Sequence, residues 1–372
     1  MENLPENCPV ILACNHPNAF LDSIVMTTCA RRSLHYTARG DFFKSKVASF
    51  LLRYIQILPV FRGEEGKEHL YKNEETFSYC IEVLKKNGAV SIFSEGLSEN
   101  EYDLRPLRKG TARLASEAWG NPDIGDKLKV VPVAIQYSSW LKSCPVVYVE
   151  FLKNIERKSF ADIDESGLFN KKFNEELKDI LMEKCIVVDK SGDVFLQNKL
   201  IRYVLKNFNN GVSIAKKVQD KYLSPGNESF KKNYNVLSEF LTAGNINYWK
   251  ESETGIINFL FSALVYIVAC VTNVIPYYVS KLIAWKSAKD NAFKDSLLYC
   301  TLMIIYPMYL ISLFCVIKSY LNISAGIIIV LLTLVSAFRY ERSRRNIRCF
   351  LKKDKLRIVH EMLSRLFETS NG

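Results

Sequence analysis

The last third of the sequence contains three long stretches without a charged residue, at Thr254–Ser280, Ser296–Ile317 and Ser319–Phe338. Each is close to the ~20 apolar residues that a helix needs to cross the hydrocarbon core of a bilayer. Only Lys318 separates the second stretch from the third. These two therefore predict a transmembrane hairpin, with helices at 296–317 and 319–338. A soluble domain would have to bury all of this apolar surface, which makes a membrane protein the favoured interpretation.

Basic residues on both sides of the hairpin predict its orientation. Residues 339–357 carry nine Lys or Arg against two acidic residues, and the loop Lys281–Lys294 also carries lysines. Cytoplasmic loops are enriched in Lys and Arg, so we expect this loop and a basic tail at 341–372 to be cytoplasmic. The N-terminal domain would then lie on the cytoplasmic face of an integral membrane protein.

The segment 254–280 has to fit this orientation as well. If it also crossed the bilayer, the loop at 281–294 and the N-terminal domain would lie on opposite sides. We therefore expect this segment to lie in the membrane interface or to pack on the hairpin, with an interruption at Asn273 and Pro276. The whole membrane region then covers residues 254–340.

Composition restricts the partners of the chain. The net charge of +11 favours anionic partners such as lipid headgroups and phosphorylated substrates. The sequence has no segment in which basic and aromatic residues alternate, and its Cys and His residues do not have the spacing of a zinc site. Nucleic acid is therefore not an expected partner. The ten cysteines are scattered without a C-x-x-C pair, which favours reduced thiols over disulfides. The polar start at Met1–Pro9 is unlike a secretory signal peptide.

The first 155 residues alternate β-rich runs with stretches of helical spacing. This alternation predicts an α/β domain with a mostly parallel sheet flanked by helices. Residues 156–253 are mostly polar and are expected to form a helical insertion, with a break at Ser224-Pro225-Gly226. The expected strands are Pro9–Cys14, Leu34–Thr37, Ile57–Phe61, Val90–Phe93, Val130–Ile135 and Val146–Leu152. The expected helices are Asp22–Arg32, Phe42–Tyr54, Glu68–Asn87 and Gly110–Trp119.

The segment Asn15–Asp22 is the sharpest candidate for a reactive site, because it directly follows an apolar strand. The end of a strand in an α/β sheet is where reactive groups usually lie. Histidine is a common general base, and Asp22 could accept the second ring N–H of His16 and so fix the tautomer. No serine or cysteine is placed as a covalent nucleophile, so the nucleophile would be a hydroxyl of the substrate. A core histidine beside a helix-capping aspartate would show the same pattern.

Three further segments follow: two at the ends of expected strands, and Val130–Ala134 in an expected strand that contains Pro132. Leu58–Gly63 places Arg62 where it could bind a phosphate with two hydrogen bonds. Phe93–Ser98 places an acid and a glycine, Glu95 and Gly96, in a turn. The basic loop Arg105–Gly110 then leads into a helix whose N-terminal N–H groups favour anions. In addition, Pro132 lies within an expected strand, which suggests an edge strand or a bulge. Each feature alone has an ordinary surface interpretation.

In this order and spacing, the four segments resemble the glycerolipid acyltransferase family typified by the bacterial lysophosphatidate acyltransferases. The resemblance spans roughly residues 9–136. It implies that His16 is the base, with Asp22 as its partner, and that Arg62 binds a glycerol phosphate. The candidate substrate-binding residues are Asn15, Arg62, Glu95, Gly96, Arg105 and Lys109.

Two departures from the family pattern bear on the substrate. Five residues separate His16 from Asp22 where the family usually has four, and Ser94 stands where the family usually has proline. The longer spacer is similar to that of the branch with fungal-type glycerol-3-phosphate/dihydroxyacetone-phosphate acyltransferases. The turn at Pro17-Asn18 can absorb the extra residue.

The resemblance implies direct acyl transfer to a glycerol-backbone hydroxyl of a glycerol phosphate or lysophospholipid. The donor would be acyl-CoA or an acyl carrier protein, acting as co-substrate, with no other cofactor and no metal. Two alternatives stay open. The acceptor could be a lyso-lipid without phosphorus, or the chain could be a non-catalytic lipid-binding protein on the same fold.

Overall fold

The structure is a computed structural model, and the chain divides into two compact units. The N-terminal unit comprises Met1–Tyr137 and Val147–Val187, and the C-terminal unit comprises Ser138–Val146 and Val188–Gly372. The structure describes residues 4–43, 45–60, 72–140, 146–160, 162–163, 165–188, 190, 194–207, 212–213, 215–216, 256–288 and 291–351.

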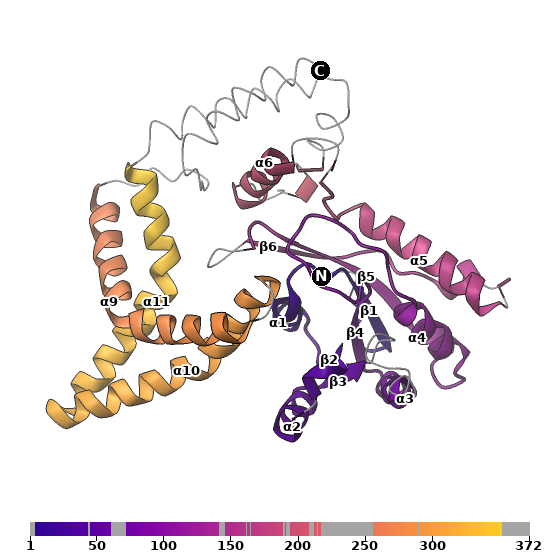
Figure 1. Ribbon diagram of the computed structural model, residues 1–372, viewed down its shortest axis with the longest axis horizontal. Coiled ribbons are helices and arrows are strands. Elements are labelled where there is room, and N and C mark those ends of the chain that lie inside the picture. Colours follow the sequence, from indigo (N-terminus) through magenta and orange to yellow (C-terminus); the bar gives the residue numbers. More distant parts are fainter. Residues whose placement is uncertain are drawn as a thin grey trace, which may run out of the picture. The chain divides into compact units, whose positions relative to one another are not determined.

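A six-stranded sheet forms the centre of the N-terminal unit (Figure 1). Its strand order is β3-β2-β4-β1-β5-β6, and all neighbours are parallel except β5 and β6. This confirms the mostly parallel α/β sheet predicted from the sequence. The strands are β1 (Val10–Cys14), β2 (Leu34–Arg39), β3 (Ile57–Val60), β4 (Ala89–Phe93), β5 (Lys129–Tyr137) and β6 (Val147–Phe151).

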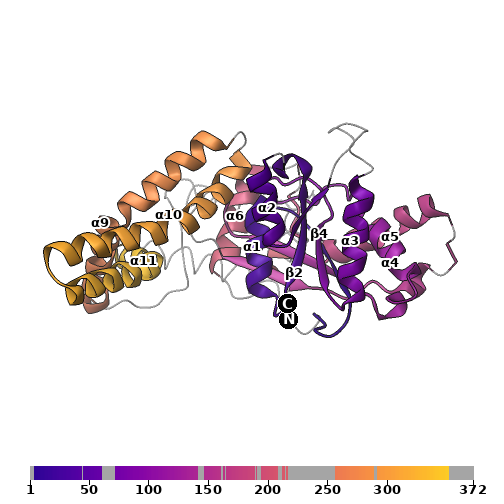
Figure 2. The ribbon, with the colours of Figure 1, turned by 90° about the horizontal axis from the view of Figure 1, so that it is seen from below.

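Helices cover both faces of the sheet. Figure 2 shows α1 and α2 on one side of the strands and α3, α4 and α5 on the other. The expected helix 42–54 is divided into a short 3₁₀ turn, η1 (Gly40–Phe43), and α2. The helices are α1 (Ala19–Cys29), α2 (Lys46–Tyr54), α3 (Lys72–Lys85), α4 (Lys109–Gly120) and α5 (Ser166–Met182).

Helix α5 belongs to the N-terminal unit. From the sequence, its residues were expected to be part of a separate helical insertion at 156–253. Its apolar residues recur every four positions and form one buried stripe, Phe169, Phe173, Leu177 and Leu181. This stripe packs in the same core as α3 and α4, where Phe169 and Phe173 both contact Trp119 edge-on. The boundary between the units therefore falls after Val187 rather than at residue 155. The break at 224–226 lies outside the described residues.

Pro132 lies in β5, an inner strand, whereas the sequence suggested an edge strand or a bulge. The pairing of β5 with β6 ends at Val133 and Phe151, and Val133 directly follows the proline in the sequence. The carbonyl of Pro132 accepts the N–H of Leu152 at 2.9 Å. In a strand the nitrogen and the carbonyl of one residue face the same neighbour, so the missing N–H of Pro132 faces β6 at the end of the antiparallel pairing.

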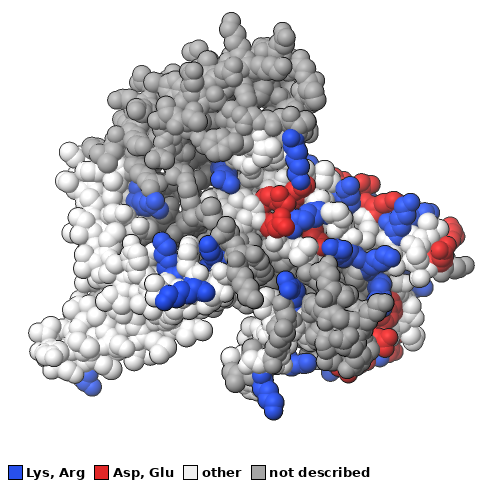
Figure 3. Space-filling model, in the orientation of Figure 1, with Lys and Arg blue, Asp and Glu red and all other residues white. Residues whose placement is uncertain are grey.

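The C-terminal unit contains α6 (Val194–Asn207) and three long helices, α9 (Ile256–Ser287), α10 (Asn291–Tyr320) and α11 (Ile323–Leu351). By length and composition, the three long helices could each cross a membrane, over Ile256–Ser287, Ser296–Tyr320 and Ile323–Tyr340. Their surface is mostly uncharged in Figure 3, whereas acidic and basic side chains gather on the N-terminal unit.

The boundaries of these helices differ from the expected ones. The hairpin turns at 321–322, and Lys318 lies in the last turn of α10. The expected interruption at Asn273 and Pro276 is wrong, because α9 runs through both residues as one helix. Figure 1 shows that α9 changes direction partway along its length. A proline inside a helix is the usual cause of such a kink.

Polar side chains join the three long helices. Tyr306 of α10 donates its hydroxyl to Asn273 of α9 at 2.6 Å, and Asn346 of α11 donates to Ser262 of α9 at 3.0 Å. Such hydrogen bonds between helices are common where the surroundings are apolar. Helix α9 thus packs on α10 and α11. The tail beyond residue 351 lies outside the described residues.

Candidate active site

The two sharpest motifs meet at the point in the sheet where the strand order reverses. Strand β1 leads into α1 on one face of the sheet, whereas its neighbour β4 leads through the loop to α4 on the other face. Adjacent strands whose connections part in this way leave a crevice at their carboxyl ends, where α/β proteins bind ligands. His16 follows β1 and Glu95 follows β4, so both residues lie at this point.

The structure brings His16 and Asp22 together. The Nδ1 atom of His16 lies 2.8 Å from Oδ2 of Asp22, whose side chain is fully buried in the first turn of α1. Helix α1 begins at Ala19, three residues earlier than expected, so the turn at 17–18 absorbs the five-residue spacer. Ala19 has a positive φ of 42°, and its N–H donates to the hydroxyl of Ser98. The turn after β4 thereby supports the turn after β1.

Two further donors hold the Asp22 carboxylate in place. The N–H of Asn18 donates to Oδ2 at 2.9 Å, and the hydroxyl of Tyr137 donates to Oδ1 at 2.7 Å. Hydrogen bonds to an ionised carboxylate are stronger than those between neutral groups. Tyr137 is fully buried at the end of β5, and the sequence analysis missed it. Its only signal in the sequence is its position at a strand end.

The imidazole of His16 is fixed and accessible at the same time. Its ring stacks on Phe93 with centroids 4.1 Å apart and planes 16° apart, and its side chain is 17% exposed. Because Asp22 accepts a hydrogen bond from Nδ1, the neutral ring leaves Nε2 as a lone-pair base. Among the described residues, no Ser, Thr or Cys side chain is hydrogen-bonded to this ring.

A covalent cysteine mechanism does not fit the nearest thiol. Cys14 directly precedes this motif, but it is fully buried in β1. Burial raises the pKa of its thiol to about 12, and Ser91 offsets this only in part through a hydrogen bond. The thiol is therefore neutral and inaccessible at physiological pH.

Glu95 braces the backbone of the site. One of its oxygens accepts the N–H of His16 at 2.7 Å, and the other accepts the N–H of Arg105 at 3.2 Å. Burial raises the pKa of this carboxyl, while these two N–H donors and the charge of Arg105 act in the opposite direction. Its position in the motif predicts a substrate ligand. In the structure, Glu95 joins the histidine turn to the basic loop.

Asn15 and Gly96 also act on the backbone. The side-chain amide of Asn15 donates to the carbonyl of Ile135 at 3.0 Å and accepts its N–H at 2.7 Å. It thus extends the pairing of β1 with β5 by one residue. Gly96 has a φ of +69°, which a residue with a Cβ rarely adopts, and a Cβ there would lie 3.1 Å from Arg108.

Ser94, the departure from the family pattern, has a structural reason. Its N–H donates to the carbonyl of Cys14 at 2.8 Å, a bond that a proline could not form. Its hydroxyl lies 2.9 Å from that of Thr111 in α4, and its carbonyl accepts the N–H of Arg108. Ser94 therefore joins β1, β4 and the start of α4.

The structure describes two of the three expected cationic ligands, Arg105 and Lys109. The side chain of Arg105 contacts Glu101 at 3.3 Å and Glu99 at 3.8 Å, although its Nη1 atom is buried without a hydrogen-bond partner among the described residues. Lys109 is exposed at the first position of α4. Arg62 lies outside the described residues.

The fold and the site define a class of protein. A histidine base oriented by a buried aspartate, at the crevice of a mostly parallel sheet, suits the activation of a substrate hydroxyl. In the part of the chain that the structure describes, no cluster of His, Cys, Asp and Glu could hold a metal ion.

Comparison with known proteins supports the resemblance drawn from the motifs. Residues 1–136 match the family model named Acyltransferase. Among solved structures, the chain is similar to the 1-acyl-sn-glycerophosphate (LPA) acyltransferase PlsC from Thermotoga maritima. The identity is 17%, the TM-score is 0.33, and the match covers 48% of this chain and 68% of the other. No curated protein matches the chain in sequence.

Proposed function

We propose that this protein is a membrane-bound O-acyltransferase of phospholipid synthesis. It would transfer a fatty acyl group from an acyl thioester to a hydroxyl of a glycerol phosphate or lysophospholipid. The observation that carries the proposal is the contact of His16 with the buried Asp22 inside the stretch that matches the acyltransferase family. The thioester would belong to acyl-CoA or to an acyl carrier protein.

The reaction follows from the orientation of the imidazole. Nε2 of His16 removes the proton from the acceptor hydroxyl, whose oxygen attacks the carbonyl carbon of the thioester. Asp22 stabilises the imidazolium that forms. The tetrahedral intermediate then collapses, the C–S bond breaks, and the departing thiolate takes the proton from the imidazolium. The products are an ester and a free thiol, and no acyl-enzyme is formed.

The long apolar helices support attachment to a membrane, where the lipid acceptor and product reside. We propose that α10 and α11 cross the bilayer as a hairpin and that α9 packs on them. The basic end of α11 and the N-terminal unit would then lie on the cytoplasmic side, where acyl thioesters are found.

The proposal is tested with the purified full-length protein in lipid vesicles and a labelled acyl thioester. The acceptors are glycerol 3-phosphate, lysophosphatidate and a lyso-lipid without phosphorus, each with acyl-CoA and with acyl carrier protein as donor. We expect transfer to a phosphate-bearing acceptor and a loss of at least about 100-fold for Asp22→Asn. No transfer to any acceptor would refute the proposed function, and exclusive use of the phosphorus-free acceptor would refute the substrate class.

A further inference from the structure

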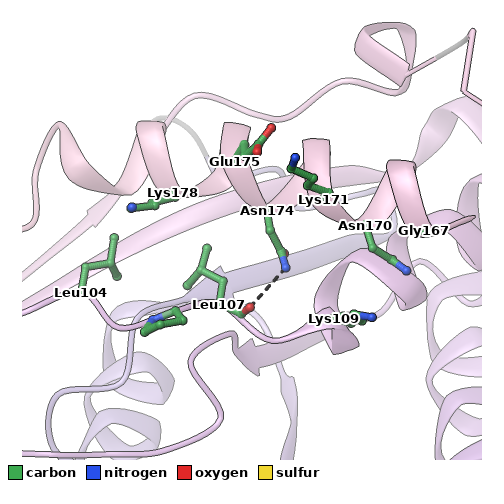
Figure 4. A pocket seen from close by; sticks show the side chains of 10 residues that line it. Leu104, Leu107, Lys109, Gly167, Asn170, Lys171, Asn174, Glu175 and Lys178 are labelled. Carbon is green, nitrogen blue, oxygen red and sulfur yellow. Dashed lines mark hydrogen bonds between the residues drawn. The ribbon is translucent and has the colours of Figure 1, made fainter.

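A pocket of about 550 Å³ lies within the N-terminal unit, between the basic loop and α5 (Figure 4). This volume is in the range of pockets that bind small organic molecules. The loop supplies one wall and the helix supplies the other. The lining residues are Leu104, Pro106, Leu107, Lys109, Gly167, Asn170, Lys171, Asn174, Glu175 and Lys178.

The pocket is positively charged. Three of its lining residues are lysines, Lys109, Lys171 and Lys178, against the single carboxylate of Glu175. In the part of the chain that the structure describes, none of the three ammonium groups has an acidic partner within salt-bridge distance. Lys109 also begins α4, whose N-terminal N–H groups favour an anion. The chemistry of the pocket therefore suits a ligand with phosphate groups.

The pocket also has an apolar wall and a fixed shape. Leu104, Pro106 and Leu107 supply the apolar surface. The side-chain amide of Asn174 points from α5 to the loop, where it donates to the carbonyls of Leu107 at 3.3 Å and Arg108 at 3.4 Å (Figure 4). The ligand should therefore combine phosphates with a larger uncharged part.

The loop that forms this pocket is bonded to the candidate active site. The N–H of Arg105 donates to Glu95, whose other oxygen accepts the N–H of His16. A ligand held against this loop is thus placed relative to the base. The wall formed by α5 lies beyond residues 1–136, the stretch that matches the acyltransferase family.

We propose that this pocket binds the phosphate-bearing nucleotide end of a coenzyme A thioester, an inference that rests on the proposed function. The lysines would contact the phosphates, and the apolar wall would contact the nucleotide. The long uncharged arm of coenzyme A then carries the thioester toward His16. Glycerol 3-phosphate is much smaller and has no part that uses the apolar wall, so this acceptor fits the pocket less well.

The test compares two variants of the full-length protein in detergent. Lys171→Ala/Lys178→Ala removes two cations from the pocket. Lys172→Ala is the matched control, because Lys172 is next in sequence on α5 but lines a separate hollow with Asp179 and Glu183. Coenzyme A binding is measured by calorimetry, and KM is measured separately for acyl-CoA and for the acceptor.

We expect the double variant to bind coenzyme A about tenfold more weakly, with a matching rise in the acyl-CoA KM. The acceptor KM and the Lys172→Ala variant should stay at the wild-type values. Unchanged coenzyme A binding in the double variant would overturn the proposal, as would a rise confined to the acceptor KM. So would binding of holo acyl carrier protein without binding of coenzyme A. If coenzyme A binding weakens as expected but even the wild type transfers no acyl group, the pocket assignment stands and the proposed function fails.

Discussion

The carboxylate of Asp22 is the point where the separate segments of the candidate site meet. It accepts hydrogen bonds from the ring of His16, the N–H of Asn18 and the hydroxyl of Tyr137. These donors come from the turn after β1 and from the far end of β5. A fully buried carboxylate needs such donors, because burial without them would cost far more than the interactions return.

Removing the hydroxyl of Tyr137 should therefore affect both stability and catalysis. Tyr137→Phe takes one donor from a buried carboxylate, a loss of about 1.5–3 kcal/mol in the free energy of unfolding. We expect the acyl-transfer rate to fall by about tenfold as Asp22 loses its fixed position. Thermal unfolding and labelled acyl transfer measure the two effects.

Tyr36→Phe is the matched control for this prediction. The hydroxyl of Tyr36 is also hydrogen-bonded to α1, through the carbonyl of Ser23 at 3.0 Å, but it does not contact Asp22. Its removal should lower stability while leaving the transfer rate near the wild-type value. Equal rates for the two variants would contradict a special role of Tyr137.

The raised pKa of Glu95 predicts that the stability of the protein depends on pH. Burial raises the pKa of this carboxyl in the folded protein above the ordinary value of 4.5. The folded state then binds the proton more tightly than the unfolded state, so the contribution of Glu95 to the free energy of unfolding falls as the pH rises above 4.5. We expect wild type to lose stability relative to Glu95→Gln over this window, measured by thermal unfolding at a series of pH values. A difference that does not change with pH would contradict this assignment.

Sequence reasoning found the pair at the centre of this site but not the residues that hold it. The contact of Tyr137 with Asp22 spans 115 residues and depends on the pairing of β5 with β1, which no local pattern reveals. For the same reason, the bonds of Asn15 and Glu95 to neighbouring backbone were not foreseen. Their motif positions suggested substrate contacts, whereas the structure gives both side chains partners within the protein.

Among the elements, the turn after β4 requires a backbone conformation that suits glycine. Gly96 adopts a φ of +69° there. Gly110, in the first turn of α4, adopts no positive φ, and a Cβ there would meet no described atom within 4 Å. The two glycines therefore differ in what a methyl group would do.

Alanine substitutions at these positions should have opposite signs. Gly96→Ala should destabilise the protein by about 1–2 kcal/mol, because an L-residue is strained at this φ. Gly110→Ala should stabilise it by about 0.5–1 kcal/mol, because it restricts the unfolded chain and favours helix. Chemical or thermal unfolding of both variants measures the difference. A Gly96→Ala variant as stable as the wild type would show that the turn does not require the glycine.

The strands and helices of residues 1–155 were largely predictable, because each is short and carries a clear apolar period. Strand β4 begins within one residue of its expected start, and β6 lies one residue inside the expected bounds. Helix α5 was assigned to a separate insertion because its stripe appears only every fourth residue between many charges. The continuity of α9 was missed because Pro276 normally ends a helix in water, whereas neighbouring helices here supply polar partners.

For the whole molecule, the number of membrane crossings decides which side each end occupies. With two crossings, by α10 and α11, both ends of the chain lie on the cytoplasmic side, as the basic residues of 339–357 favour. We expect tags at the two ends to be digested together from the cytoplasmic side of sealed vesicles. Tags on opposite sides would mean that α9 crosses as well.

The central claim is that His16 is the general base of an acyl transfer. The most direct measurement is the rate of labelled acyl transfer by His16→Ala and wild type in the same vesicles, with coenzyme A binding as the check that the variant is folded. We expect the rate to fall by about 10²–10⁴-fold while binding is retained. Undiminished transfer by His16→Ala would contradict this account.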